Sequence, residues 1–430
     1  MSAIALLMGL LLLSFLGSLI VGRGRGAAAP GLPSGVEYLG LGFAVGPTAL
    51  GLVERQMIHD FEPIVQVALG WLAFVVGLDF GRVEKRRVRP VSMVLGVLCA
   101  VLTGAVVAYA AYRMLLVVKV PGLDSTGLIL LSVGAGAVGC ETTRVGIKWV
   151  SSRWNAKGPI CDLLVELAAA DDFAPYVTAG ALFALVPNSG LGLDLPPLGW
   201  FGASLVLGGL LGTVTALLLR GAEGYAVWGA LIGVLLLGVG TAQRFGMCTL
   251  FVTFVMGIAL SGFSQSRRIL RRMVGATERG VLYPVLLLAG ARLDLRPIFD
   301  HAMLGAVVAA VLLARIVGKV ASGLVVRMVL PVARPAGPAI GIVLLSSGPV
   351  SIATAFVFSL RFPGVVGDTL LVCAVGSAIL GELVSTFALK RLLTEAGEIS
   401  QDSEPPPPSE IHDEEPESQL RPEPESEAKA

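Results

Sequence analysis

Apolar segments long enough to cross a membrane recur along almost the whole chain. A helix crosses the hydrocarbon core with roughly 20 apolar residues, and runs such as 91–111 are apolar on every face. Strands of a membrane barrel would instead alternate apolar and polar residues. Of the 430 residues 55% are hydrophobic and 15% are charged, a balance unlike that of ordinary soluble domains. The sequence therefore predicts an all-α polytopic membrane protein in a lipid bilayer.

The apolar segments predict about 13 transmembrane helices by a helix-length count. Their expected positions are 3–21, 37–54, 63–81, 91–112, 124–148, 158–187, 199–219, 225–241, 246–263, 277–293, 302–328, 335–360 and 366–389. The first could also be a cleaved signal peptide, but no Lys or Arg precedes it while Arg23 and Arg25 follow it directly. These flanks favour a retained span.

Basic residues gather in alternate loops of this prediction. The loops around 82–89, 148–157 and 267–272 hold most of the Lys and Arg, and the loops between them hold few. Because cytoplasmic loops carry an excess of positive charge, we expect the N-terminus outside and the C-terminus in the cytoplasm of a bacterial inner membrane. After Thr394 the chain turns to Glu, Pro and Ser, which predicts a disordered cytoplasmic tail over 394–430.

Four carboxylates lie in one apolar span, which reads CDLLVELAAADDFAPYV. A charge at mid-membrane is expensive and normally faces an ion path or a partner, so the adjacent Asp171 and Asp172 are the strongest candidates for ion binding. Asp162 and Glu166 lie nearer the helix end, where acids reach water easily. We interpret these two mainly as the rim of an aqueous vestibule, with direct ion binding as the lesser alternative.

A second charged feature is the segment ARIVGKVASG, which lies inside another apolar span. Arg315 and Lys319 are four residues apart and therefore lie on the same helix face. One of them is expected to neutralise an aspartate. A lysine can gain or lose its proton there, whereas an arginine remains charged, so both alternatives stay open from spacing alone.

Two glycine-rich spans contain polar residues where a continuous apolar helix is expected. They are SVGAGAVGCETTR, with Glu141, Thr142 and Thr143, and LLSSGPVSIAT, with Ser346 and Ser347. Unwound backbone at membrane depth is tolerated where it lines a cavity, and paired interruptions in two halves of a chain point to a transporter site. The alternative is close packing of small residues in intact helices.

The interrupted spans are the fifth and twelfth of the predicted thirteen. If spans one to six repeat as spans eight to thirteen, the two interruptions correspond. A shift by seven spans inverts the orientation, so the halves would be related by an axis in the membrane plane. This is an inverted-topology repeat, typical of alternating access.

With these features the chain resembles the cation:proton antiporter superfamily over roughly residues 39–393, in particular the electrogenic branch typified by NhaA and NapA. The resemblance is carried by GLGFAVGPTALGL, WLAFVVGLDF, the Asp–Asp pair, LYPVLLLAGARLDL and VGKVASG. It implies an NhaA-like fold with two broken crossing helices. It also implies a homodimer, a dimerisation part at about 1–90 and 199–293 and a core at about 91–187 and 302–390.

The resemblance also implies roles for individual residues. Asp172 would bind sodium or a proton in competition, and Asp171 would pair with Lys319, with Arg315 as the alternative partner. The family places Thr-Asp in the first broken helix, where this chain has Glu141 and Thr142 in the reverse order. The double aspartate implies that more protons than cations are exchanged.

The predicted function is therefore electrogenic exchange of Na⁺ or Li⁺ for protons. Alternatives are a potassium/proton antiporter of the same superfamily, a sodium-coupled organic-anion symporter of the same fold, and a gated channel or sensor. No nucleotide-binding motif, no metal-ligand spacing of cysteines and no nucleophile–base set is evident. We therefore expect no cofactor, no nucleic-acid partner and no enzymatic activity.

Overall fold

The computed structural model describes residues 35–53, 55–80, 90–120, 123–186, 194–220, 225–264, 267–296, 302–337 and 339–399, together with residues 9, 12 and 298. All regular elements in these ranges are helices, which confirms the predicted all-α fold. Seven of the helices are long and apolar enough to cross a membrane. The predicted span 3–21 lies outside the described residues except for Gly9 and Leu12.

Most helices of the first half lie within the predicted spans, but one helix is shorter than its span and another span is divided into two helices. They are α2 (Val36–Val45), α3 (Arg55–Asp60), α4 (Glu62–Phe80), α5 (Pro90–Val118), α6 (Ser125–Gly139), α7 (Arg144–Arg153), α8 (Pro159–Asp171) and α9 (Phe173–Leu185). Helix α2 covers only part of the predicted span 37–54, because Gly46 and Pro47 follow it and proline cannot continue a helix. The predicted span 158–187 divides into α8 and α9 at Asp172.

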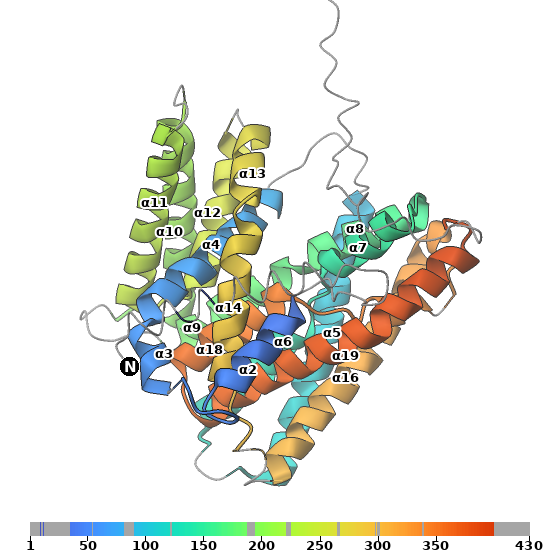
Figure 1. Cartoon of the computed structure of the whole chain (residues 1–430), viewed down its shortest axis with the longest axis horizontal. Coiled ribbons are helices and arrows are strands. Elements are labelled where there is room, and N and C mark those ends of the chain that lie inside the picture. The colour runs from blue at the N-terminus through green and yellow to red at the C-terminus, as the bar shows by residue number, and fades with distance from the viewer. Residues whose placement is uncertain are drawn as a thin grey trace, which may run out of the picture.

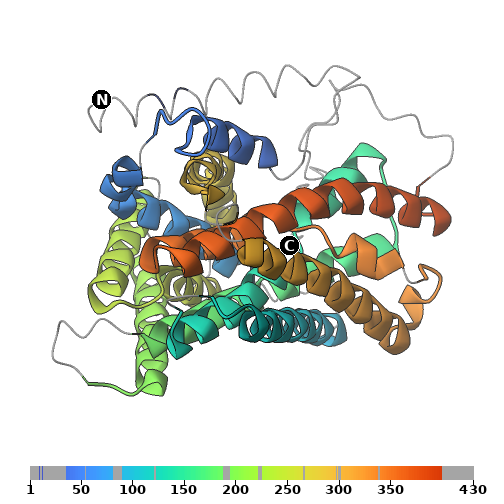
Figure 2. The ribbon, with the colours of Figure 1, turned by 90° about the horizontal axis from the view of Figure 1, so that it is seen from below.

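The second half contains the longest described helix and the second broken one. Its helices are α10 (Pro197–Leu218), α11 (Tyr225–Phe245), α12 (Thr249–Phe263), α13 (Arg267–Gly275), α14 (Glu278–Arg292), α16 (Ala302–Val329), the 3₁₀ turn η2 (Pro331–Ala333), α17 (Ala339–Val343), α18 (Pro349–Arg361) and α19 (Val365–Glu395). Figure 2 shows α19 running across one face of the molecule.

The helices form two packed groups. In Figure 1, α4 and α10–α13 stand on one side, while α5, α7, α8, α16 and α19 lie on the other. We call α2, α4 and α10–α14 the panel bundle, and α5–α9 and α16–α19 the crossing bundle. Helices α9 and α18 of the crossing bundle pack against α12, α10, α4 and α14 of the panel bundle, so the broken helices lie at the junction.

The panel bundle repeats one helix crossing in both halves of the chain. Helix α4 packs against α12, which correspond to predicted spans three and nine. Helix α14 packs against α2, which correspond to predicted spans ten and two. At the first crossing Gly77 and Gly257 each lie against the backbone of the facing helix, and Gly42 and Gly290 do so at the second. A Cβ at any of the four would overlap a carbonyl oxygen. The repeated glycine contact is what an inverted repeat predicts.

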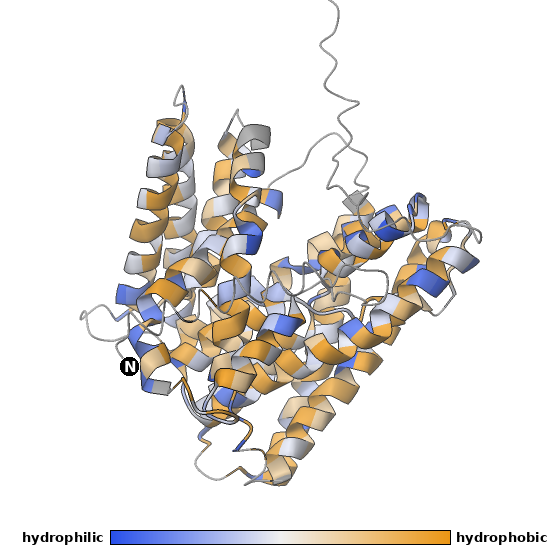
Figure 3. Ribbon diagram, viewed as in Figure 1, coloured by the Kyte–Doolittle hydropathy of each residue, from blue (hydrophilic) through white to orange (hydrophobic). Residues whose placement is uncertain are grey.

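Large apolar side chains remain exposed on the outer helices. Leu198, Val206 and Leu210 of α10 and Val117 of α5 are each more than half exposed, and apolar residues colour the helices throughout Figure 3. In water such a surface would be unfavourable, but in a bilayer it contacts lipid tails. The protein is a multi-pass membrane protein.

The first residues of the predicted tail are ordered. Helix α19 continues to Glu395, and the described chain reaches Ile399, which is buried. The Glu398 carboxylate accepts hydrogen bonds from the backbone N–H groups of Ile160 (2.7 Å) and Cys161 (2.8 Å). These belong to the first turn of α8, whose free N–H groups and positive end favour a carboxylate. The remainder of the predicted tail lies outside the described residues.

We expect Glu398→Ala to lower the free energy of unfolding by about 1–2 kcal/mol, because the first turn of α8 loses its cap. The measurement is detergent-solubilised unfolding followed by tryptophan fluorescence. Glu395→Ala is the matched control, since Glu395 makes only an exposed i,i+4 pair with Arg391 and such pairs contribute little. Equal losses in both variants would contradict the assigned cap.

Candidate functional site

The two broken helices meet at their interruptions. Helix α6 ends at Gly139 and α7 begins at Arg144, while α17 ends at Val343 and α18 begins at Pro349. The backbone N–H of Thr143 donates to the carbonyl of Ser346 (3.2 Å), and the Thr142 hydroxyl donates to the carbonyl of Leu344 (3.1 Å). The two interruptions therefore supply hydrogen-bond partners to each other's backbone groups, which need such partners at membrane depth. The two predicted broken crossing helices are confirmed.

Buried charges compensate the helix ends at this crossing. The Glu141 carboxylate accepts from the backbone N–H of Gly348 (2.9 Å) and the hydroxyl of Ser347 (3.2 Å), at the N-terminal end of α18. The Arg315 guanidinium donates to the carbonyls of Glu141 (2.9 Å) and Leu345 (3.0 Å), beyond the C-terminal ends of α6 and α17. Negative charge at N-termini and positive charge at C-termini stabilise helix ends. Arg315 therefore stabilises the crossing of the two broken helices.

Lys319 occupies the position between the crossing and the aspartates. Its ammonium donates to the carbonyl of Cys140 (2.5 Å) and the hydroxyl of Thr142 (2.6 Å), and lies 3.3 Å from Asp171 Oδ2. Lys319 and Asp171 are 2% and 4% exposed, so each charge depends on the other. The second oxygen of Asp171, Oδ1, is buried without a hydrogen-bond partner. An unpartnered carboxylate oxygen of this kind is a suitable ligand for a hard cation.

The aspartate pair sits at an interruption of its own helix. Helix α8 ends at Asp171 and α9 begins at Phe173. Pro175 has no N–H group to donate back to the carbonyl of Asp171, which breaks the regular bonding there. Both carboxylates are buried and point to different partners, because successive helix positions do not share a face.

Asp172 is held by a chain of charges that extends into the panel bundle. Its Oδ2 lies 3.1 Å from Arg144 Nη2, and Arg144 Nη1 lies 3.4 Å from Asp79 Oδ2. Arg271 pairs with Asp79 and lies 3.6 Å from Glu278. These charges alternate in sign, so each is compensated by its neighbours.

Aromatic side chains of α9 directly follow the aspartate pair in the chain. On α9, Phe173 stacks with Phe80 (ring centroids 5.3 Å apart), and Tyr176 packs against Phe254 (4.8 Å). Phe80 and Phe254 belong to the panel bundle, so the contacts cross the bundle junction. One helical turn beyond Asp172 the junction is closed by rings.

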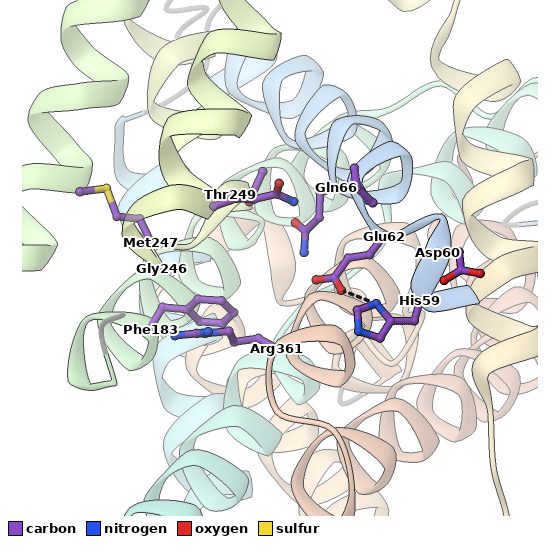
Figure 4. Close-up of a pocket in the computed structure, with 11 residues that line it drawn as sticks. His59, Asp60, Glu62, Gln66, Phe183, Gly246, Met247, Thr249 and Arg361 are labelled. Carbon is purple, nitrogen blue, oxygen red and sulfur yellow. Dashed lines mark ion pairs between the residues drawn. The ribbon is translucent and has the colours of Figure 1, made fainter. Parts of the chain in front are cut away.

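A cavity of about 430 Å³ lies further along α9, where Phe183 lines it. Its polar residues come from both bundles and include Glu62, Gln66 and Arg361, with an ion pair between His59 and Glu62 (3.3 Å) (Figure 4). Phe183 is eleven residues beyond Asp172, about 16 Å along a helix. The cavity is therefore separated from the aspartates by the aromatic contacts.

The structure divides the residues singled out from the sequence into four groups. Asp171, Lys319 and Thr142 form one contact cluster, and Glu141, Arg315, Ser346, Ser347 and Thr143 form the crossing. Asp172 pairs separately with Arg144. Asp162, near the start of α8, is exposed, and Glu166 is half-buried about one and a half turns before the pair. Asp162 lies at a distance from the aspartate pair, as expected for a rim residue.

Sequence reasoning did not single out Asp79, Arg144 or Arg271. A signal existed for two of them: Asp79 is a charge in the apolar segment WLAFVVGLDF, and Arg144 directly follows the polar interruption. Charges at such positions are expected to have a partner. Arg271 stands in an arginine-rich loop segment, where nothing distinguishes one arginine from the next.

Comparison with known proteins gives matches in structure alone. No family model matches this chain, and no curated protein matches it in sequence. Its structure is similar to that of the sodium proton antiporter MjNhaP1 from Methanocaldococcus jannaschii at pH 8, with a TM-score of 0.66 and 16% identity over 91% of this chain and 98% of that chain. A second structure of MjNhaP1, determined by electron microscopy, gives 0.62 and 16% over 93% and 100%.

The chain has the fold of a sodium proton antiporter. The similarity extends over 91% of this chain, so it is not confined to one of the two bundles. At 16% identity the similarity shows the fold alone. The chemistry of this chain follows from its own residues.

Proposed function

We propose that this protein exchanges sodium or lithium ions for protons across a bacterial inner membrane. The observation that carries the proposal is the buried Asp171–Asp172 pair beside two crossing broken helices, with Lys319 3.3 Å from Asp171. Buried intramembrane carboxylates mark ion and proton paths. The structural similarity to a sodium proton antiporter supports the same proposal.

In this proposal Asp172 binds either a cation or a proton. Asp171 is paired with Lys319 inside the crossing bundle, whereas the partner of Asp172, Arg144, also contacts Asp79 of the panel bundle. A proton on Asp172 removes the negative charge that a cation needs, so the two substrates exclude each other. Carboxylate, hydroxyl and carbonyl oxygens are hard ligands that suit sodium or lithium.

Movement of the crossing bundle against the panel bundle would expose Asp172 to each side in turn. Two kinds of contact join the bundles next to Asp172: the aromatic ring contacts and the Arg144–Asp79 pair. We propose that exchange is electrogenic, since Asp171 and Lys319 can carry a further proton between them. The protein would act as a homodimer with its C-terminus in the cytoplasm, without a cofactor and without enzymatic activity.

The test is cation-driven proton movement in proteoliposomes. Purified protein is reconstituted with a lumenal pH dye, and Na⁺, Li⁺ or K⁺ is added outside. We expect external Na⁺ or Li⁺ to enter the wild-type liposomes in exchange for protons and so to alkalinise the lumen. Asp172→Asn should lose at least about 100-fold in rate, since the site loses its charge. Glu395→Gln, which changes an exposed carboxylate near the end of α19, is the control and should retain the wild-type rate.

Three results would change the proposal. A response to K⁺ alone would identify a potassium/proton antiporter, and sodium-driven uptake of an organic anion without proton exchange would identify a symporter. In the Na⁺ and Li⁺ assays, a rate that rises when potassium and valinomycin compensate charge supports electrogenic exchange, and an unchanged rate contradicts it. If no cation moves protons in the wild type, the antiporter proposal fails.

A further inference from the structure

The carboxylate that is proposed to bind the cation is already paired with a positive charge of the protein itself. Arg144 Nη2 lies 3.1 Å from Asp172 Oδ2, within the range of a charge-assisted hydrogen bond. Asp172 is 4% exposed at its side chain, and Arg144 is 20% exposed. The guanidinium is therefore the more exposed member of this buried pair.

The same guanidinium has a second acceptor in the other bundle. Its Nη1 lies 3.4 Å from Asp79 Oδ2 on α4. Asp79 is held in place by Arg271, which donates to both of its oxygens. Arg144 thus stands between two carboxylates, one on each side of the junction.

Helix stability does not account for an arginine at this position. Arg144 is the first residue of α7, directly after Thr143, whose hydroxyl caps the helix. A cation at a helix N-terminus is unfavourable, because the N-terminal end carries partial positive charge. The placement is therefore supported by Asp172 and Asp79 together.

We propose that Arg144 is a tethered cation that competes with the transported cation for Asp172, and that Asp79 retains the guanidinium when the transported cation displaces it. The proposal rests on the proposed function, because it assumes that Asp172 binds the cation. In the structure Asp172 and Asp79 share the guanidinium; in the cation-bound site Asp79 holds it alone. The empty site then contains no uncompensated Asp172 charge.

This competition has a quantitative consequence for cation affinity. A site that is open for only a fraction of the time binds its ligand more weakly by that fraction. Removing the tethered cation should therefore lower the sodium concentration that half-saturates the protein. Removing Asp79 should raise that concentration, because the displaced guanidinium loses the carboxylate that contacts it from the panel bundle.

The experiment compares Arg144→Gln and Asp79→Asn with the wild type in the proteoliposome assay. We expect KM for sodium to fall about tenfold in Arg144→Gln and to rise about threefold in Asp79→Asn. Arg153→Gln is the matched control on the same helix, where Arg153 stacks on Trp149 and Trp154; its KM should equal the wild-type value. The sodium dependence of thermal stabilisation in detergent should shift in the same directions, since it reports binding without transport.

Opposite shifts in the two variants support the competition, because general damage to the junction would move both in one direction. An unchanged or raised KM in Arg144→Gln overturns it, and so does a fall in Arg153→Gln as large as that in Arg144→Gln. If Arg144→Gln does not elute as a single folded species, Asp79→Asn decides: a raised KM supports the proposal and an unchanged or lowered one overturns it. A wild type that transports while the variants fail this test leaves the proposed function intact, whereas an inactive wild type refutes that function first.

Discussion

Replacing Lys319 by alanine is expected to lower the free energy of unfolding by about 3–5 kcal/mol, since it leaves Asp171 as a buried charge without a counter-ion. Lys319 is 2% exposed and lies 3.3 Å from Asp171. The substitution also removes the donor to the carbonyl of Cys140 and the hydroxyl of Thr142. Unfolding of purified protein in detergent, followed by tryptophan fluorescence, measures the loss.

The double variant Asp171→Asn with Lys319→Met separates charge from packing. Removing both charges of a buried pair costs less than removing one, so most of the stability lost in Lys319→Ala should return. Lys157→Ala is the control, because Lys157 is exposed at the end of the α7–α8 connection. If Lys319→Ala unfolds under the same conditions as Lys157→Ala, the buried pair does not stabilise the fold as the geometry indicates.

Glu141→Ala is the second variant with a large expected effect. It leaves the N–H of Gly348 and the hydroxyl of Ser347 without their acceptor and leaves Arg315 with less negative charge nearby. Unsatisfied buried groups cost about 1–3 kcal/mol each, so we expect a loss of roughly 3–5 kcal/mol in the same unfolding measurement.

Glu141→Gln should lose clearly less than Glu141→Ala, because its amide oxygen can still accept from Gly348. The difference between the two variants reports the hydrogen bonds at the start of α18, and the loss in Glu141→Gln reports the charge. Equal stability of Glu141→Ala and the wild type would mean that α18 does not need this acceptor.

Local sequence patterns were sufficient for most of the long helices and for the two crossing interruptions, but they did not predict the break between α8 and α9 at Asp172. Apolar runs of membrane length can satisfy their backbone only as helices, which fixes the class of fold without tertiary information. Glycine with polar residues in SVGAGAVGCETTR and LLSSGPVSIAT marks where the helices break. The boundary of α2 was harder to place, because Gly46 and Pro47 end the helix inside an apolar run.

The partner of Asp171 could not be decided from spacing. Arg315 and Lys319 lie on the same helix face, and either could approach Asp171, which precedes Lys319 by 148 residues. In the structure Arg315 binds the carbonyls at the helix ends and Lys319 lies beside Asp171. Arg315 and Lys319 differ in position by one helical turn along α16. Which of them reaches Asp171 depends on where α6 and α17 pack against α16.

By itself the sequence determined an all-helical membrane protein with two interrupted spans in corresponding halves and a buried aspartate pair. It could do so because length, hydropathy, proline and glycine act locally on the backbone. Only the tertiary structure decided which charges compensate which: Glu141 with α18, Lys319 with Asp171, and Arg144 between Asp172 and Asp79. These pairs join residues far apart in the chain, and their energies depend on distances and burial that arise when the two bundles pack together.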